Sequence, residues 1–182
     1  MIYVYGTEIR IIKEDNYKFN SLDNVRKYNK VYFSSGNDVK SSTTEIGVIF
    51  TIADIKILLA SSGFSSVHET SYLIIEDSLY VCVGDSIFSI NINDFSLNWV
   101  RKADDISCFQ IFYFNNKLIV HGELNISCFE TYGNKKWNFT ARDIFVTLDG
   151  SNDFYISDSK IHVKDWDNNE YILNVDGQLI GY

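Results

Sequence analysis

Short runs of hydrophobic residues, interrupted by polar ones, follow one another along most of the chain, and each run ends at a turn-forming residue. The clearest runs are "DSLYVCVGDSIFSINI" at 77–92 and "NKLIVHGELNISCFET" at 116–131. Alternation with a period of two places successive side chains on opposite faces of an extended strand. From residue 70 onward, the pattern therefore predicts short β-strands separated by tight turns.

The two runs also match each other position by position. Leu79 corresponds to Leu118 at an offset of 39 residues, and Trp99 and Trp137 lie 38 residues apart. Each copy is predicted to contain three strands, the last ending in an aromatic residue, followed by a loop and a further strand. Four short strands in roughly 40 residues are typical of one blade of a β-propeller.

A third copy, at residues 153–175, is weaker and shorter. Its predicted correspondences are Phe154 with Leu118, Ile161 with Ile126, and Tyr171 with Trp137. The loop-linked further strands are expected at 108–114, "CFQIFYF", and at 143–148, "DIFVTL". The repeat thus extends to the last residues of the chain, with small deletions.

The chain is therefore predicted to be one all-β domain, residues 1–182, built of antiparallel, propeller-like blades. We expect three to four blades, whereas closed propellers have about 4–8, so the prediction is an open or partial β-propeller. An N-terminal hairpin is expected at 2–12, with Gly6 at its turn, and a short helix near 21–29 stays open. The clearest copies span residues 70–107, 108–145 and 146–182.

The stretch "LYVCVGDSIFSINI", followed by "SLNWV", resembles the repeat of quinoprotein-type β-propellers, in which an apolar strand, a Gly/Asp turn, a second strand and a late Trp recur. The resemblance implies the fold of residues 70–182. Ser86 stands where that repeat has Gly, Ser89 where it has Ala, and Asn91 where it has Asp. The glycine before Trp99 is missing, which implies looser docking of this ring between blades. Because no residue matches those that hold a quinone, no cofactor is implied.

No catalytic site is predicted, and we expect that the protein is not an enzyme. Each histidine falls in a different repeat, without a second ligand at a spacing typical of metal sites. The cysteines are odd in number and lie among β-forming residues, which indicates buried, reduced thiols. Nucleophile-elbow, phosphate-loop and zinc-protease motifs do not occur. These histidines and cysteines are His68, His121, His162, Cys82, Cys108 and Cys128.

The best metal candidate is the stretch "DWDNNEYILNVD" at 165–176, which resembles a twelve-residue calcium loop. Its positions 1, 3, 5 and 12 are occupied by Asp165, Asp167, Asn169 and Asp176. Position 6, where the sharp turn needs Gly, is Glu170, and the residues after it have the pattern of a strand. The sequence therefore favours a solvated hairpin turn over a metal site.

The N-terminus lacks the features of a secretory signal, and the longest apolar window, 45–60, is interrupted by Asp54 and Lys56. It is also shorter than the ~20 residues that a membrane span needs. We therefore expect a soluble, cytoplasmic protein. The formal net charge of −8 disfavours binding to nucleic acid or to an anionic membrane and favours a cationic partner.

Residues 149–182 carry seven acidic and two basic side chains, a net charge of −5 out of −8. Strict alternation places Trp166 on the face opposite Ile161 and Val163, either packed as a structural residue or exposed as an aromatic anchor ringed by carboxylates. The predicted partner-binding residues are Asp149, Asp153, Tyr155, Asp158, Asp165, Trp166, Asp167, Glu170 and Asp176.

By overall profile the chain resembles bacterial immunity proteins of contact-dependent growth inhibition and related toxin systems. The resemblance implies an inhibitor that occludes the active site of a cognate basic toxin, expected to be a nuclease and first of all an RNase. The alternative is a propeller-like scaffold or ligand-binding module, whose open edges a homodimer would cover. Steep salt dependence of binding would favour the inhibitor, and concentration-dependent self-association the scaffold.

Overall fold

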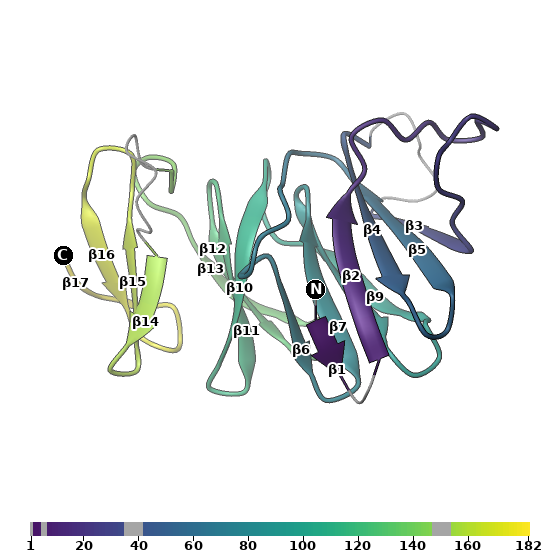
Figure 1. Ribbon diagram of the computed structural model, residues 1–182. Coiled ribbons are helices and arrows are strands. Elements are labelled where there is room, and N and C mark those ends of the chain that lie inside the picture. Colours follow the sequence, from purple (N-terminus) through teal and green to yellow (C-terminus); the bar gives the residue numbers. More distant parts are fainter. Residues whose placement is uncertain (1, 5–6, 35–41, 147–153) are drawn as a thin grey trace.

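The computed structural model describes residues 2–4, 7–34, 42–146 and 154–182. Within these ranges every regular element is a β-strand, and the strands form four separate sheets (Figure 1). The all-β prediction is confirmed. Residues 21–29 form turns and bends, so the short helix that stayed open there is not formed. None of the described ranges contains a helix long and apolar enough to cross a membrane.

The first sheet has five strands in the order β1-β2-β4-β5-β3. Their bounds are β1 Ile2–Val4, β2 Thr7–Lys13, β3 Lys30–Phe33, β4 Thr44–Phe50 and β5 Ile55–Ser61. β1 and β2 pair as the predicted N-terminal hairpin, whereas the predicted turn residue Gly6 lies outside the described residues. β3 pairs with β5 in parallel and is thus an exception to the predicted antiparallel pairing.

The other three sheets are four-stranded antiparallel meanders, in which each strand pairs with the next along the chain. The second sheet consists of β6 Tyr72–Ile75, β7 Ser78–Val83, β8 Ser86–Asn91 and β9 Leu97–Lys102. The third consists of β10 Cys108–Phe114, β11 Lys117–Gly122, β12 Ile126–Glu130 and β13 Lys135–Phe139. The fourth consists of β14 Phe154–Ser157, β15 Lys160–Lys164, β16 Glu170–Leu173 and β17 Leu179–Gly181.

The predicted alignment of the third copy is wrong by one strand. Phe154 lies on the first strand of the fourth sheet, whereas Leu118 lies on the second strand of the third sheet. Tyr171 lies on a third strand, β16, and Trp137 on a fourth, β13. The predicted strand at 143–148 causes the error, because residues 143–146 form bends and no strand. Residues 147 and 148 lie outside the described part.

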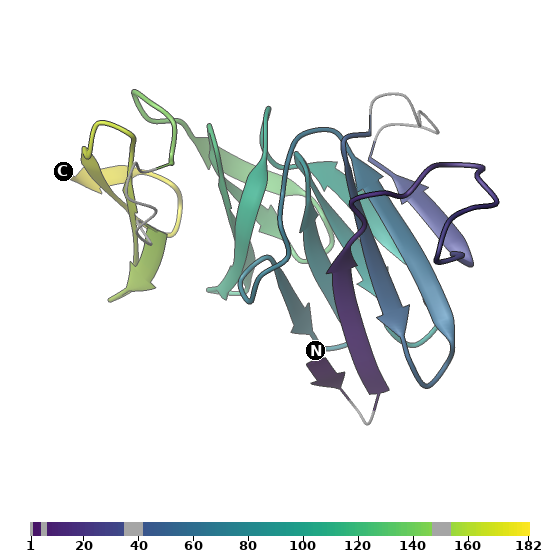
Figure 2. The ribbon, with the colours of Figure 1, turned by 45° about the horizontal axis from the view of Figure 1, so that its top comes forward.

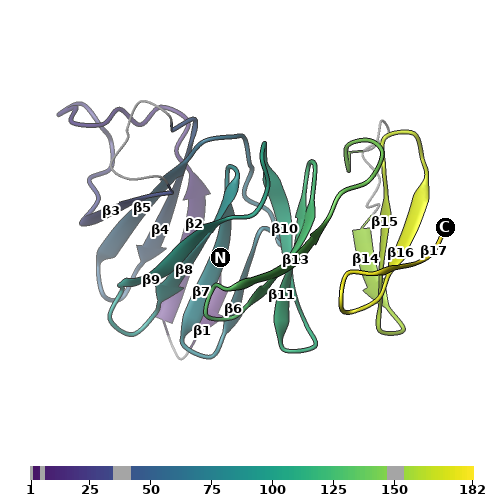
Figure 3. The same cartoon turned by 180° about the vertical axis from the view of Figure 1, so that it is seen from behind.

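Consecutive sheets pack face to face, and each pair encloses its own apolar core. The first core includes Phe50 and Phe88, the second Cys82 and Phe129, and the third Cys128 and Phe154. As predicted, the three cysteines are buried and unpaired. Figures 2 and 3 show the result as an open stack, with the first and the fourth sheet at opposite ends.

Trp99, on the last strand of the second sheet, fastens that sheet to the third. Its indole Nε1–H donates a hydrogen bond to the Thr131 carbonyl oxygen at 3.0 Å. Its ring lies against Gly133 in the β12–β13 turn, where an added Cβ would be 2.8 Å from the Trp99 Cδ2 atom. The expected looser docking is wrong, because the glycine that receives the ring comes from the following sheet.

Trp137 repeats this contact between the third and fourth sheets. Its Nε1–H donates to the Val175 carbonyl oxygen at 3.2 Å, and its ring covers Gly177. The register positions of the two rings correspond, since Trp99 pairs with Ser89 and Trp137 pairs with Cys128. In the fourth sheet the corresponding pair is Ile172 and Gly181, so the last sheet has no tryptophan at this position.

Candidate functional site

Part of the outer face of the first sheet, around Gly47 in β4, is covered by the segment 14–29 of the same chain. A Cβ added at Gly47 in β4 would collide with the hydroxyl of Tyr28, which shows how closely the segment lies on the strand. The Tyr28 ring packs edge-on against Tyr17 at 5.5 Å, and its hydroxyl donates a hydrogen bond to Glu14. Burial and this hydrogen bond raise the pKa of Tyr28, and Glu14 also forms an ion pair with Arg26 at 3.0 Å.

The outer face of the fourth sheet has a different surface. Alternation along β14 and β15 sends Phe154, Ile161 and Val163 into the third core, so that Tyr155 and His162 face the other way. These two rings stack at 4.5 Å with an interplanar angle of 4°. The Tyr155 side chain is 50% exposed, and this face is therefore open to a partner.

A shallow hollow of about 100 Å³ lies on this outer face, and β14, β15 and β16 supply all the residues that line it. Beside the two rings, Ile172 adds an aliphatic side chain opposite His162. At the edge of the hollow, Lys164 forms an ion pair with Glu170 at 2.9 Å. We refer to Tyr155, His162, Lys164, Glu170 and Ile172 as the outer patch.

Asp165, predicted to contact a partner, is fully buried, and this part of the prediction is wrong. Its carboxylate accepts hydrogen bonds from the Asn169 backbone N–H at 2.9 Å and from the Tyr171 hydroxyl at 2.7 Å. Burial works to raise the pKa of Asp165, but the hydrogen bonds from Asn169 and Tyr171 outweigh it and hold the pKa below its ordinary value. This ionised carboxylate ties the β15–β16 turn together.

Trp166 is half-buried, so it is neither the packed structural residue nor the exposed anchor that the sequence analysis considered. The strand alternation on which the prediction rests ends at Lys164, the last residue of β15. The Trp166 backbone N–H donates to the Ile144 carbonyl oxygen at 2.8 Å, which holds the turn against the connection from the third sheet. Its placement is thus set by the turn and not by the strand.

The remaining acidic residues do not gather at one place. Asp158 lies in the β14–β15 turn and Asp176 in the β16–β17 turn, at one end of the fourth sheet, whereas Asp167 lies in the β15–β16 turn at the other end. All three are exposed. Asp149 and Asp153 lie outside the described residues. That these exposed carboxylates act together as a contact surface therefore stays a prediction.

This arrangement also separates the residues of the possible calcium loop. Asp165 and Asp176 lie at opposite ends of β16, and the carboxylate of Asp165 is already occupied by Asn169 and Tyr171. In the ranges that the structure describes, no group of three or more His, Cys, Asp or Glu side chains is placed to hold a metal ion.

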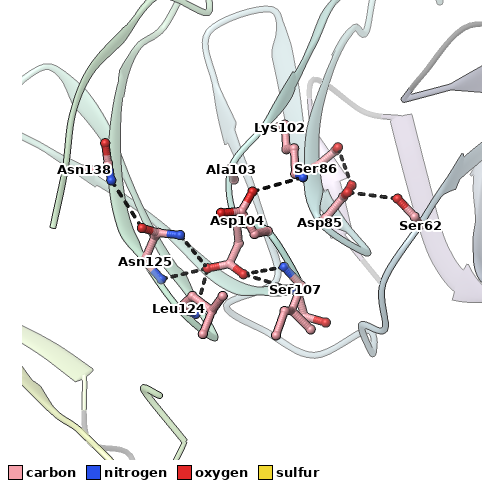
Figure 4. A network of polar contacts seen from close by, with 12 residues as sticks. Ser62, Asp85, Ser86, Lys102, Ala103, Asp104, Ser107, Leu124, Asn125 and Asn138 are labelled. Carbon is pink, nitrogen blue, oxygen red and sulfur yellow. Dashed lines mark hydrogen bonds and ion pairs between the residues drawn. The ribbon is translucent and has the colours of Figure 1, made fainter. Parts of the chain in front are cut away.

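Two buried carboxylates that the sequence analysis missed join the first three sheets (Figure 4). Asp104 follows β9 and accepts hydrogen bonds from the backbone N–H groups of Leu124 at 2.8 Å and Asn125 at 2.7 Å, in the third sheet. Asp85, in the β7–β8 turn, accepts from the hydroxyls of Ser61 at 2.7 Å and Ser62 at 2.9 Å. The Gly84–Asp85 turn indicated a hairpin, but only the fold brings these donors together.

Both buried carboxylates serve structure. Asp104 also accepts backbone hydrogen bonds from Ile106 at 2.7 Å and Ser107 at 3.1 Å, so four N–H donors surround it. Hydrogen bonds from several backbone N–H groups to one carboxylate order the loops that supply the donors. The network therefore fixes the loops at one end of the stack.

The thiols lie where a nucleophile would be poorly activated. Burial, together with the neighbouring Cys82 thiol, raises the pKa of Cys108 well above its ordinary value, and the Cys108 thiol donates to the Ser86 carbonyl oxygen. Burial raises the pKa of Cys128 to about 11. Because the thiolate is the reactive form, both groups are unreactive near neutral pH in the folded protein.

His121 occupies a core position. It is 8% exposed, and its ring stacks on Phe154 at 5.0 Å. Its Nδ1 atom lies 2.9 Å from the Gln110 side-chain oxygen, and its Nε2 atom lies 3.1 Å from the Phe145 carbonyl oxygen. This imidazole joins the third sheet to the fourth.

Comparison with known proteins places the chain by fold alone. No family model and no curated protein matches it. Among solved structures, BamB from Moraxella catarrhalis, which has a β-propeller-like fold, is 14% identical with a TM-score of 0.49. The computationally designed Ika4 protein is 10% identical with a TM-score of 0.50, over 64% of this chain and 76% of its own. The match to BamB covers 75% of the present chain and only 42% of the BamB chain.

Proposed function

We propose that this protein is a non-catalytic protein-binding module, and that the outer patch of the fourth sheet is its contact surface. The difference between the two ends of the stack supports this proposal. Tyr28, with Tyr17 against it, packs over β4 of the first sheet, whereas strand residues of the fourth sheet are themselves exposed, Tyr155 to 50% and Ile180 to 52%. Exposed apolar side chains grouped on one face of a soluble domain are a common mark of a partner site.

Charge supports a basic protein as the partner. The exposed carboxylates of Asp158, Asp167 and Asp176 lie in the turns at the two ends of the fourth sheet, and the whole chain carries a formal charge of −8. Such a surface speeds the encounter with a cationic protein and disfavours polyanions. Within this class we propose a basic toxin domain, first of all a nuclease, which the module would neutralise as an immunity protein by covering its substrate groove.

A pull-down from the native bacterial lysate with paired variants tests the proposal. The contact variant combines Tyr155→Ala with Asp167→Lys, an exposed position in the β15–β16 turn between Lys164 and Glu170. The matched control combines Leu22→Ala with Asp23→Lys, which makes the same kinds of change on the segment 14–29, where Leu22 is 90% exposed. We expect a basic protein that the wild type and the control retain at low salt, that high salt releases, and that the contact variant retains at least about fivefold less.

The retained protein is then assayed for nuclease activity, which the wild type should suppress and the contact variant should not. Equal retention by the contact variant and the control would contradict the outer patch as contact surface. Sedimentation equilibrium of the bait alone tests for a homodimer. A wild-type dimer that the contact variant dissociates would show that a second copy covers the patch, and it would overturn the proposal of a basic partner.

A further inference from the structure

A groove of about 520 Å³ lies between the second and third sheets, far from the outer patch. It lies beside the contact between Trp99 and the β12–β13 turn, and its volume is within the ~300–1,000 Å³ of ligand pockets. Four of its lining side chains are aromatic, namely Tyr80, Trp99, Tyr113 and Tyr132. Tyr113 is 49% exposed and Tyr132 is 63% exposed, so these two rings are open to a ligand.

Stacking of the sheets does not require the two exposed tyrosines. At the next interface, Ile156 stands at the position of Tyr113. Tyr113 pairs with Leu118 and Ile156 pairs with Ile161, and each pair lies one step before the last pair of its hairpin. Asp176, which precedes the turn glycine Gly177, stands at the position of Tyr132. The third and fourth sheets therefore pack in the same way without aromatic side chains at these two places. Packing of the repeated sheets therefore does not account for the two tyrosines.

The groove also has one formal charge among its lining residues, the carboxylate of Glu76. Glu76 lies in the β6–β7 turn with a φ of 50°, in the left-handed region. The corresponding residues of the next two sheets are Asn115, with a φ of 49°, and Asp158, with a φ of 48°, which are types that tolerate this conformation better than Glu does. The turn geometry therefore does not account for a glutamate here.

We propose that this groove binds a guanidinium or ammonium group, with the cation against the faces of Tyr113 and Tyr132 and beside the Glu76 carboxylate. The negative face of an aromatic ring attracts a cation, and a nearby carboxylate adds to that attraction. The charge of −8 on the whole chain favours the approach of such a ligand. The site is separate from the outer patch, and it does not depend on the function proposed above.

The test uses a pair of probes that differ in charge and hardly in shape. N-acetylarginine methylamide carries the guanidinium, and N-acetylcitrulline methylamide replaces it with a neutral urea. Binding is followed by the ¹H–¹⁵N cross-peak of the Trp99 indole, which lines the groove and is assigned with the Trp99→Phe variant. We expect a saturable shift with the arginine compound in the millimolar range and at least about fivefold weaker binding of the citrulline compound.

Tetramethylammonium, as a third probe, distinguishes the source of the cation. Tighter binding of tetramethylammonium indicates a small quaternary ammonium ligand, and tighter binding of the arginine compound indicates a protein side chain. Either result supports a cation site. A shift of the Trp99 indole by maltose, without a shift by either cation, would instead assign the groove to sugars and overturn the proposal.

Variants of exposed groove residues complete the test. Glu76→Gln and Tyr132→Leu should each weaken binding of the arginine compound by about two- to fivefold, which matches the loss of one exposed ion pair or cation–π contact. Tyr182→Leu, at a position that is 86% exposed and lies outside the groove, serves as the control and should leave binding unchanged. Unchanged affinity in both groove variants, or equal binding of the arginine and citrulline compounds, would overturn the proposal.

Discussion

At the scale of single residues, the fold depends on contacts between a large side chain and a residue that has none. The rings of Trp99 and Trp137 lie on turn glycines of the following sheet, and both glycines have positive φ values, +94° for Gly133 and +76° for Gly177. Any side chain there would meet both a strained backbone and the indole ring. This double requirement explains why a glycine occupies each position.

Gly133→Ala should therefore lower the free energy of unfolding by roughly 2–4 kcal/mol, the sum of left-handed strain and overpacking. Gly181→Ala is the matched control, since a Cβ there would meet only the flexible end of the Ile172 side chain, at 3.2 Å. Urea denaturation of both variants measures the difference. Equal stability of the two would show that the ring can move aside and that the contact does not fasten the sheets.

Asp165→Asn should destabilise the protein by about 1–3 kcal/mol at pH 7, because an amide cannot accept from Asn169 and Tyr171 as the carboxylate does. The pKa of Asp165 is lowered in the folded state, so its ionisation stabilises the fold above the ordinary pKa of 3.8. That contribution is lost as the pH falls through the folded-state pKa.

The difference between wild type and Asp165→Asn should thus shrink below pH 4, as measured by denaturation at pH 7, 4 and 2.5. Asp167→Asn, at an exposed position of the same turn, is the control and should change stability by less than about 0.5 kcal/mol. A pH-independent difference would assign the effect of Asp165→Asn to shape and not to charge.

At the scale of elements, the strands of the second and third sheets could be predicted from the sequence. Their strands are short apolar runs that end at turn residues, and the two full copies align with each other position by position. The predicted alignment of the fourth sheet is shifted by one strand, because "DIFVTL" has the pattern of a strand. In the structure, the backbone groups of Ile144 and Phe145 form hydrogen bonds outside any sheet. Phe145 donates its N–H to the Glu123 carbonyl oxygen, and Ile144 accepts from Trp166. Tertiary contacts thus overrode local propensity.

Trp137→Leu should loosen the fourth sheet and leave the second intact. The variant removes the indole hydrogen bond to Val175 and the ring that covers Gly177. We expect hydrogen exchange in β14–β17 to accelerate about tenfold or more, while exchange in β6–β9 stays within twofold of the wild type. Trp166→Leu is the control, since Trp166 is held through its backbone N–H. Uniform acceleration in all sheets would contradict an interface that opens separately.

At the scale of the whole molecule, each of the three apolar cores that the described residues form lies between two sheets that are consecutive along the chain, as in a repeat protein. Residues 14–29 cover part of the first sheet around Gly47, and the last sheet has Gly181 at the register position of the docking tryptophans. Opening should therefore begin at the fourth sheet and proceed toward the first. The cysteines report on this order, because Cys128 belongs to the third core while Cys82 and Cys108 belong to the second.

In mild urea, Cys128 should be alkylated before Cys82 and Cys108, as followed by mass spectrometry of the peptides. Burial raises the pKa of Cys128 to about 11 in the folded state, so its reaction at pH 8 requires opening of the third core. We expect at least a fivefold difference in rate between the two interfaces. Simultaneous alkylation of all three thiols would show that the four sheets unfold as one cooperative unit.

The strand pattern, the repeat of about 40 residues, the burial of the cysteines and the acidic charge can all be predicted from the sequence, because each depends on local hydrophobic patterning or on composition. The tertiary structure is needed to know which side chains meet. It placed Asp165 in the interior, gave Trp137 a glycine 40 residues further along the chain, and left the outer patch and the groove beside Tyr132 exposed. Such contacts join residues far apart in sequence. A local pattern does not predict which face of a strand packs against a neighbouring sheet.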